Sequence, residues 1–301
     1  MLRQYTDWIT CKVAGCHTTL KFDGYKSELL PLSKGLNQGC PLSGIAFQFY
    51  NSDLVDIGEL NKGKDVVMLM DDTLLSVCGK TLIEMNNWVK NMMTRDGSRL
   101  DWSCMHQCKF AIDKFGVMGL TRRREPNPSG SLKTRPIQRR PIFLQGVKVP
   151  AIATHKFLGV MLDQELRWKE HCQYVLQKGV KWVTQYWRLT KYMRWFFISV
   201  AIPRMMYAAD LFLVPGLGIS KGTKGFISKL AKIQRQAKLH IIGVLRSAPT
   251  DAIDACTDVL AFHLLVENLK YRAATRLVNL PQSHPLEKHI VREVNRYVKL
   301  H

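Results

Sequence analysis

Acidic residues are scarce in this chain. Its 301 residues include 44 Lys and Arg but only 24 Asp and Glu, so the formal net charge is +20 and the pI is about 9.7. Basic charge supplies affinity for nucleic-acid phosphates without sequence preference. It is also found in ribosomal proteins, in membrane-surface proteins and as simple solubility charge, so charge alone leaves these classes open.

Long apolar runs are absent as well. The most apolar stretch, residues 198–213, is interrupted by Pro203, Arg204 and Asp210, and no stretch reaches transmembrane length. No basic segment followed by an apolar core opens the chain as a secretory signal would. We therefore expect no membrane partner and an intracellular location, in the nucleus or cytoplasm, and not secretion. Hydrophobic residues still make up 46% of the chain, enough to fill a sizeable core.

The paired Cys-x-x-Cys spacing of zinc ribbons is missing from the eight cysteines. The nearest approaches to a zinc motif are residues 104–108, where His106 stands between two cysteines, and residues 11–17. Reduced and partly buried thiols explain this cysteine usage better than a metal or a disulfide framework.

Two adjacent carboxylates, Asp71 and Asp72, stand between two short apolar runs. This pattern predicts a β-hairpin with the acids at its turn. Neighbouring strand residues point to opposite faces, so Asp71 can face a site while Asp72 faces elsewhere. Such a turn suits Mg²⁺, or Mn²⁺, with substrate phosphates and water completing the coordination shell. Taken alone, the pair is also what a polar turn between two core strands contains, and that interpretation is the simpler one.

A glycine-containing loop precedes the acidic pair. Its residues follow the pattern Gly-x-x-Gln-Gly-x-x-x-Ser, and a proline inside it suits the first turn of the helix predicted to follow. The residues concerned are Gly35, Gln38, Gly39, Pro41 and Ser43. This loop and helix, followed by the Asp-Asp hairpin, resemble the signature segments of reverse transcriptases. In that family the loop contacts the template and the incoming nucleotide.

Further segments follow in the order of the same family. Residues 81–84 form a capping box that predicts an amphipathic helix, and residues 109–118 predict a turn into an apolar strand. A hairpin is predicted over residues 142–149, and the next strand resembles the primer-grip hairpin of non-LTR (LINE-type) retrotransposon reverse transcriptases. The residues that match the primer grip are Phe157, Leu158 and Gly159. The residues after it resemble the same region of fungal LINE-type elements.

The resemblance implies an α+β fold, a polymerase palm of antiparallel sheet and packed helices followed by a helical thumb-like domain. Residues 1–165 are expected to form partial fingers and the palm, residues 166–280 the thumb-like region, and residues 281–301 a polar, frayed tail. The implied activity is RNA-directed DNA synthesis, with deoxynucleoside triphosphates, an RNA template and an RNA–DNA duplex as partners. Two metal ions would clamp the attacking and leaving oxygens.

The resemblance also assigns roles to single residues. Asp71 would be a metal ligand, and Asp72 a second ligand or a support. Lys114, in the segment after the predicted helix, would stabilise charge on the pyrophosphate side. The alternative for Lys114 is a solvated lysine in a turn.

One component of a two-metal site is not found in the sequence. These polymerases also use a carboxylate on an earlier strand, whereas the acids before the glycine loop are Asp7, Asp23 and Glu28, in a stretch that resembles the segment just before that loop. We therefore expect a fragment that lacks most of the fingers and one metal ligand, and that is inactive alone. The alternative is a catalytically dead remnant that only binds nucleic acid.

A basic stretch and three helices are predicted in the rest of the chain. Proline and glycine within residues 122–140 predict a loop that lies along a nucleic-acid duplex, is simply solvated, or acts as a localisation signal. Helices are predicted over about residues 176–197, 226–245 and 252–278. Aromatic and basic residues of the first helix either stack on bases or pack a core beneath solvated cations. The second helix has an apolar stripe with basic residues outside it, which is typical of a thumb helix that faces a duplex and also of any surface helix. The arginines of the basic stretch considered for nucleic-acid binding are Arg122, Arg123, Arg124, Arg139 and Arg140.

Overall fold

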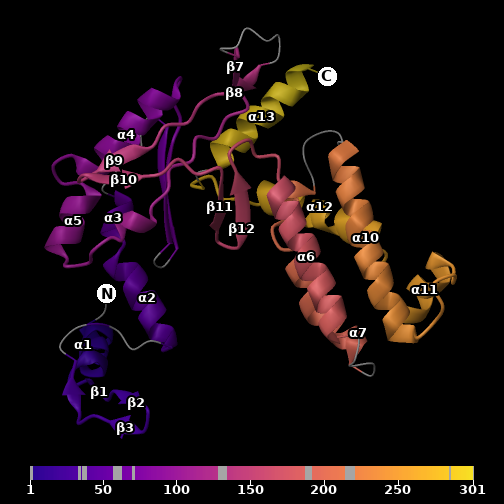
Figure 1. Cartoon of the computed structure of the whole chain (residues 1–301), viewed down its shortest axis with the longest axis horizontal. Helices are drawn as coiled ribbons and strands as arrows, with labels where there is room; N and C mark the ends of the chain where they lie inside the picture. The colour runs from indigo at the N-terminus through magenta and orange to yellow at the C-terminus, as the bar shows by residue number, and fades with distance from the viewer. Residues whose placement is uncertain are drawn as a thin grey trace. The chain divides into compact units, whose positions relative to one another are not determined.

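The computed structural model describes residues 3–32, 35, 39–56, 63–69, 72–127, 134–186, 192–213, 221–284 and 286–300. It combines helices with small antiparallel sheets, so the predicted α+β class is confirmed at that level (Figure 1). The chain divides into two compact units. Unit 1 contains residues 1–119 and 138–151, and unit 2 contains residues 120–137 and 152–301.

Unit 1 joins short hairpins to helices of moderate length. Its elements are α1 (Arg3–Val13), β1 (His17–Thr18), β2 (Lys21–Phe22), β3 (Tyr25–Lys26), β4 (Leu30–Pro31), α2 (Pro41–Tyr50), α3 (Asp53–Asp56), β5 (Lys64–Leu69), β6 (Asp72–Val77), α4 (Leu82–Thr94), α5 (Arg99–Met105), the 3₁₀ helix η1 (Ile112–Lys114), β9 (Ile142–Leu144) and β10 (Val147–Val149).

The core of unit 1 lies where α4 and α5 meet the β9–β10 hairpin. The predicted capping box starts α4, because the Thr81 hydroxyl accepts a hydrogen bond from the Glu84 N–H at 3.2 Å. The Glu84 carboxylate in turn accepts from the Lys80 N–H at 3.0 Å. The buried side chains that fill this core are Met93, Leu100, Ile142, Leu144 and Val149.

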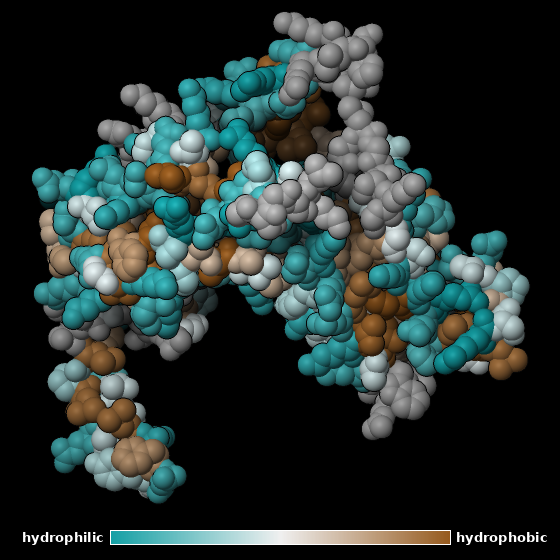
Figure 2. All heavy atoms as spheres, turned by 45° about the horizontal axis from the view of Figure 1, so that its top comes forward, coloured by the Kyte–Doolittle hydropathy of each residue, from teal (hydrophilic) through white to brown (hydrophobic). Residues whose placement is uncertain are grey.

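The N-terminal part of unit 1 has no core of its own. None of the described residues from 3 to 32 is buried, and their strands form only two-residue ladders. Figure 2 shows hydrophobic atoms on the surface in this part of the chain. The large hydrophobic side chains exposed here are Tyr5, Trp8, Leu20, Phe22, Tyr25, Leu29, Leu30 and Leu32.

Unit 2 is mainly helical. Its elements are β7 (Arg124–Glu125), β8 (Arg135–Pro136), β11 (Thr154–Phe157), β12 (Val160–Asp163), α6 (Lys169–Tyr186), α7 (Met193–Phe196), the π-helical turn η2 (Phe197–Ala201), α8 (Ile202–Met205), α9 (Ala209–Phe212), α10 (Lys221–Ile242), α11 (Thr250–Thr257), α12 (Phe262–Val278) and α13 (Glu287–Leu300).

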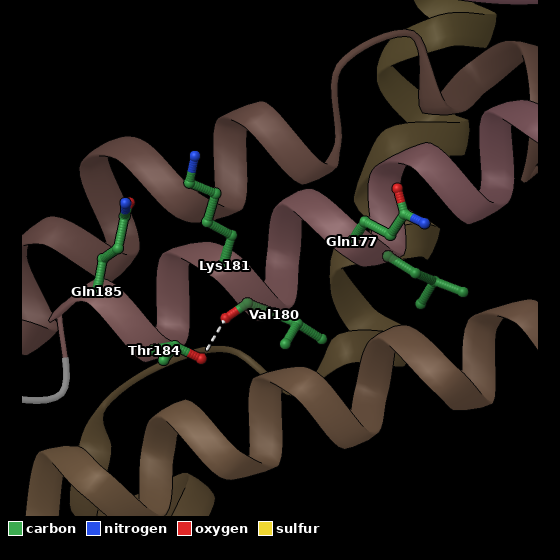
Figure 3. A pocket seen from close by; sticks show the side chains of 6 residues that line it. Gln177, Val180, Lys181, Thr184 and Gln185 are labelled. Atoms are coloured by element: carbon green, nitrogen blue, oxygen red, sulfur yellow. Dashed lines mark hydrogen bonds between the residues drawn. The ribbon is translucent and has the colours of Figure 1, made fainter.

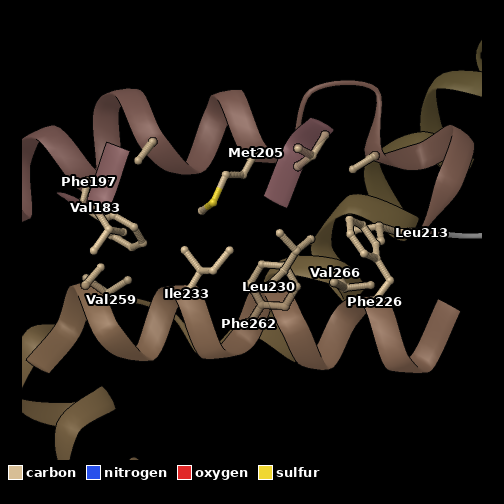
Figure 4. Close-up of a cluster of buried hydrophobic side chains, with 14 of the residues drawn as sticks. Val183, Phe197, Met205, Leu213, Phe226, Leu230, Ile233, Val259, Phe262 and Val266 are labelled. Carbon is tan, nitrogen blue, oxygen red and sulfur yellow. The ribbon is translucent and has the colours of Figure 1, made fainter. Parts of the chain in front are cut away.

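The core of unit 2 is larger and joins four helical regions. The stripe of apolar residues predicted for the helix near residues 226–245 is found on α10 and packs against side chains from α6, from residues 193–213 and from α12 (Figure 4). Leu230 and Ala237 on this stripe are fully buried. The spacing of three and four residues places these side chains on one face of the helix, which explains why the sequence located α10 well.

Four predicted elements differ from the structure. The helix predicted over residues 176–197 is divided between α6, which begins earlier and ends at Tyr186, and α7, which begins at Met193. The segment 252–278 is two helices, because Asp258 takes the left-handed conformation (φ 47°) and ends α11. The segment 109–118 forms the single turn η1 and an isolated bridge between Val117 and Ala151, not a strand. The tail expected to be frayed contains α13, whose apolar residues, such as Ile290 and Val294, recur at helical spacing.

The boundary predicted at residue 165 also differs from the observed grouping. The β11–β12 hairpin and the β7–β8 ladder belong with the helices of unit 2. Contacts between β12 and α6 explain this, since the hairpin packs on the helix that follows it.

A buried lysine links α10 to α11. The side chain of Lys238 is 1% exposed, and its ammonium group donates to Asp254 Oδ1 at 2.7 Å and to the Val259 carbonyl at 2.7 Å. A buried charge needs such partners because leaving water is costly.

Removing the carboxylate of this pair should destabilise unit 2. In Asp254→Ala the ammonium of Lys238 stays buried without its counterion, so we expect the free energy of unfolding to fall by about 3 kcal/mol. Urea denaturation followed by circular dichroism measures this. Glu267→Ala removes the exposed pair with Lys270 and should cost only about 0.5 kcal/mol. Equal losses in the two variants would contradict the role of the buried pair.

Candidate nucleic-acid and metal site

The hairpin predicted for the acidic pair is present. Strands β5 and β6 pair in antiparallel register from Lys64 with Val77 to Leu69 with Asp72. This register leaves a two-residue connection, residues 70–71. Asp71 therefore falls in the connection, which lies outside the described residues, and Asp72 is the exposed first residue of β6.

The described residues do not complete a metal site at this hairpin. Among them no group of three or more His, Cys, Asp or Glu side chains could hold a metal ion. Asp72 alone offers one carboxylate, whereas Mg²⁺ is usually held by one or two carboxylates together with substrate phosphates and water. A metal ion here therefore requires Asp71 or ligands beyond the described part of the chain.

The glycine-containing loop leads into a helix as predicted. Gly35 and Gly39 have positive φ angles of 109° and 90°, which favour glycine. Pro41 occupies the first turn of α2, where its missing N–H costs no hydrogen bond, and the Ser43 N–H donates to the Cys40 carbonyl at 3.0 Å. Gln38, which belongs to the same predicted site, lies outside the described residues.

A cysteine that the sequence did not single out stands at the start of α2. Cys40 is exposed, and the backbone N–H groups of Leu42 and then Ser43 lower the pKa of its thiol. Its thiol forms no capping hydrogen bond in this geometry, so the two N–H groups act as nearby donors at the helix N-terminus. By contrast, burial raises the pKa of the Cys172 thiol to about 11.

Alkylation should distinguish these thiols. At pH 7.5 we expect iodoacetamide to modify Cys40 faster than the exposed Cys104 and Cys256, because the thiolate is the reacting form, and to modify Cys172 last. Peptide mass spectrometry over a time course measures the four rates. A Cys40 rate equal to that of Cys104 would contradict an effect of the α2 N-terminus.

Lys114, another predicted residue of unit 1, belongs to a different element from Asp72. Lys114 is the exposed last residue of η1, a turn that packs beside β10. Among the described residues we find no hydrogen bond or ion pair between Lys114 and Asp72. The structure thus places Lys114 in a solvated turn, while its assigned role at the pyrophosphate stays a prediction.

The predicted primer-grip residues form the turn of the β11–β12 hairpin in unit 2. Leu158 and Gly159 both have positive φ angles, 47° and 83°, as a two-residue hairpin turn requires. The Tyr207 hydroxyl donates to the Leu158 carbonyl at 3.0 Å and fixes this turn. A Cβ atom on Gly159 would lie 3.4 Å from the Tyr207 ring, an ordinary van der Waals contact, so the positive φ angle and not a lack of space favours glycine here.

A buried carboxylate that the sequence did not reveal organises the loop between β12 and α6. Asp163 is 6% exposed and accepts hydrogen bonds from the N–H groups of Glu165 and Arg167, both at 3.0 Å, and of Trp168, at 2.7 Å. Leu166 and Trp168 have positive φ angles, which are unfavourable for residues with a side chain. The three bonds to one carboxylate stabilise this loop.

A buried histidine then ties α6 back to the hairpin. His171 is 1% exposed, and its Nδ1 accepts from the Met161 N–H of β12 at 3.2 Å. Its ring packs edge-on against Phe212 at 4.6 Å between ring centres, and its Nε2 has no partner among the described residues. Burial lowers the pKa of His171 below its ordinary value of 6.5, because the charged form would lose its hydration.

This burial predicts a pH dependence of stability. Unfolded His171 takes up a proton near pH 6.5 while the folded residue stays neutral, so the unfolded state binds more protons below that pH. We therefore expect the stability contributed by neutral His171 to be complete above pH 6.5 and to fall as the pH decreases below it.

Thermal melts between pH 5 and 8 should show a smaller decline for His171→Asn, whose amide oxygen can replace Nδ1 as the acceptor. His155→Asn, at an exposed position of β11, serves as the control and should keep the decline of the parent. The same decline in both variants would show that His171 is not its source.

Several arginines of the basic stretch are engaged within the fold. Arg122 donates to the carbonyls of Glu165 and Leu166 at 2.7 and 2.8 Å, so it secures the loop around Asp163. Arg139 donates to the Gly119 carbonyl at 2.9 Å. In the same stretch, Arg124 donates to the hydroxyl and the carbonyl of Thr134. Arg123 and Arg140 are exposed, and the backbone carbonyl of Arg140 accepts a hydrogen bond from the Asn86 side chain. Their predicted binding to nucleic acid stays a prediction.

Comparison with known proteins gives no match to a family model, a curated protein or a solved structure. Among the described residues, no helix combines the length and the apolar content needed to cross a membrane.

Proposed function

We propose that this chain is a LINE-type reverse transcriptase region, in which Asp71 and Asp72 bind Mg²⁺ or Mn²⁺ for the addition of deoxynucleotides to a primer on RNA. The observation that carries the proposal is the β5–β6 hairpin, whose register closes at Leu69 and Asp72, next to Asp71 in the sequence. The loop that leads into α2 through Gly39 and Pro41 precedes this hairpin in the order expected from the resemblance. Because the described residues hold no complete metal site, further ligands must come from beyond them.

A second candidate function is nucleic-acid binding without catalysis. Two observations favour it: the net charge of +20, and Asp72 as the single carboxylate at the described edge of the hairpin turn. Both candidates bind nucleic acid through phosphates, so binding alone does not separate them. Metal binding and primer extension do.

Metal binding at the acidic pair should be visible in stability. We expect added Mg²⁺ to raise the melting temperature of the parent protein and not that of the Asp71→Asn/Asp72→Asn double variant, because a ligand stabilises only the form that binds it. Asp65→Asn, at an exposed acid on β5, is the control and should keep the response to metal. If the acids only accept hydrogen bonds in the turn, the double variant should lose about 1 kcal/mol and metal should change nothing.

Primer extension separates the two candidates directly. The protein is incubated with primed RNA, deoxynucleotides and Mg²⁺ or Mn²⁺, and the same oligonucleotide measures binding over a range of salt. Extension that disappears in the double variant and persists in Asp65→Asn would establish polymerase activity. Binding that weakens steeply with salt, with neither extension nor a response of the acidic pair to Mg²⁺, would establish the second candidate. Absence of binding at low salt would exclude both.

A further inference from the structure

Two lysines from different elements share one aromatic ring in unit 2. The Nζ atom of Lys156 on β11 lies 5.4 Å from the centre of the Tyr174 ring, and that of Lys178 on α6 lies 5.6 Å from it. Both distances are within the reach of a cation–π interaction, about 6 Å. Both lysines are exposed, whereas the tyrosine is half-buried against the core of unit 2. Two positive charges from separate elements therefore lie against the same ring at the surface.

The hydrogen bond between β12 and α6 sets this arrangement. Met161, whose N–H donates to His171, is the cross-strand partner of Lys156. Tyr174 follows His171 by three residues, and the two rings lie 6.3 Å apart. Lys178 is one further turn along the same face of α6. The pair of lysines is thus a product of the fold and not of two flexible side chains alone.

No carboxylate offsets the two charges in the described part of the chain. Neither lysine forms an ion pair there, and the nearest acid on their face of α6, Glu170, stands one turn before the tyrosine, in the first turn of the helix. Two like charges fixed near each other repel, and a bound anion between them would relieve that repulsion.

The same face of α6 continues as a row of donors. Lys181 and Gln185 follow Lys178 at spacings of three and four residues, and Figure 3 shows them on the same side of the helix as Gln177. These side chains line a hollow in the surface of α6. At about 1.5 Å per residue, the row from Tyr174 to Gln185 is about 17 Å long. A row of this length suits a linear polyanion better than a single small anion.

We infer that Lys156, Tyr174 and Lys178 form a clamp for a phosphate in a nucleic-acid strand, whose backbone continues along Lys181 and Gln185. The inference rests on the proposed function for the identity of the polyanion, and it names a surface that the sequence did not. Tyr174 acts as the platform that holds the two ammonium groups, and the lysines donate to the phosphate oxygens. The hollow itself is lined by the apolar side chains of Leu176 and Val180 beside the polar ones, so the row of cations along α6, and not the hollow, carries the inference.

The test compares two double variants that remove the same charge. Lys156→Gln/Lys178→Gln removes the clamp, and Lys90→Gln/Lys148→Gln removes two exposed lysines of unit 1. Binding of a fluorescein-labelled single-stranded RNA is measured by anisotropy from 50 to 200 mM salt. We expect the slope of log K against log salt to fall by about 0.7 in the clamp variant, the value for one lost phosphate contact on a single strand, and to change less in the control. Equal changes in the two variants would overturn the clamp.

The tyrosine gives a second and independent readout. Tyr174→Phe keeps the ring and should bind RNA as the parent does. Tyr174→Leu keeps an apolar side chain but loses the ring, so the lysines are no longer held together and we expect RNA affinity to fall about threefold, a loss within the range of one cation–π interaction. Circular dichroism and thermal melts verify that both variants fold. Equal affinity of the two Tyr174 variants would show that the ring does not hold the lysines.

Failure of the clamp is distinguishable from failure of the proposed function. If the parent binds RNA with a steep salt dependence and the clamp variant matches the lysine control, only the clamp is overturned. If the clamp variant loses binding while Mg²⁺ and primer extension show no effect of the acidic pair, the clamp stands and the polymerase proposal fails. A parent protein that does not bind RNA at low salt overturns both.

Discussion

The geometry of unit 2 depends on one buried carboxylate. Asp163 collects three backbone N–H groups and so permits a tight loop in which two residues with side chains hold positive φ angles. That loop directs the chain from β12 into α6, where His171 bonds back to the strand it has just left. The loop between β12 and α6 therefore also sets the positions of the hairpin turn at Leu158 and of the two lysines at the Tyr174 ring. Buried hydrogen bonds of Asp163 and His171 thus hold the surface that we propose binds a phosphate.

Local signals were enough to predict much of the fold and the frame of the candidate site. Pro41 after a glycine, the capping residue Thr81 and the stripe around Leu230 each act within a few residues, and each marks an element that the structure contains. The hairpin around the acidic residues was predicted because apolar runs stand on either side of them, and these runs pair in register up to Asp72. In each case a short stretch of chain carries the whole physical reason.

What the sequence did not reveal depends on contacts between distant residues. Nothing near Asp163 marks it as buried, because its partners are N–H groups that only the folded loop directs toward it. His171 has the sequence context of an ordinary polar residue early in a helix, and only the folded structure shows that it accepts a hydrogen bond from the Met161 N–H of β12. The break at Asp258 was missed because helical spacing resumes directly after it. Assignment of metal ligands was equally out of reach, since it requires side chains from separate segments.

Arginines that donate to backbone carbonyls change how the basic stretch should be understood. Arg122 and Arg139 each donate to carbonyl oxygens of a neighbouring loop, so these guanidinium groups help to hold the chain in place. Neutralising the whole stretch would then loosen the loop around Asp163 as well as weaken any attraction to phosphate. A protein that uses the same cations to shape itself and to attract a polyanion couples its folding to its ionic surroundings.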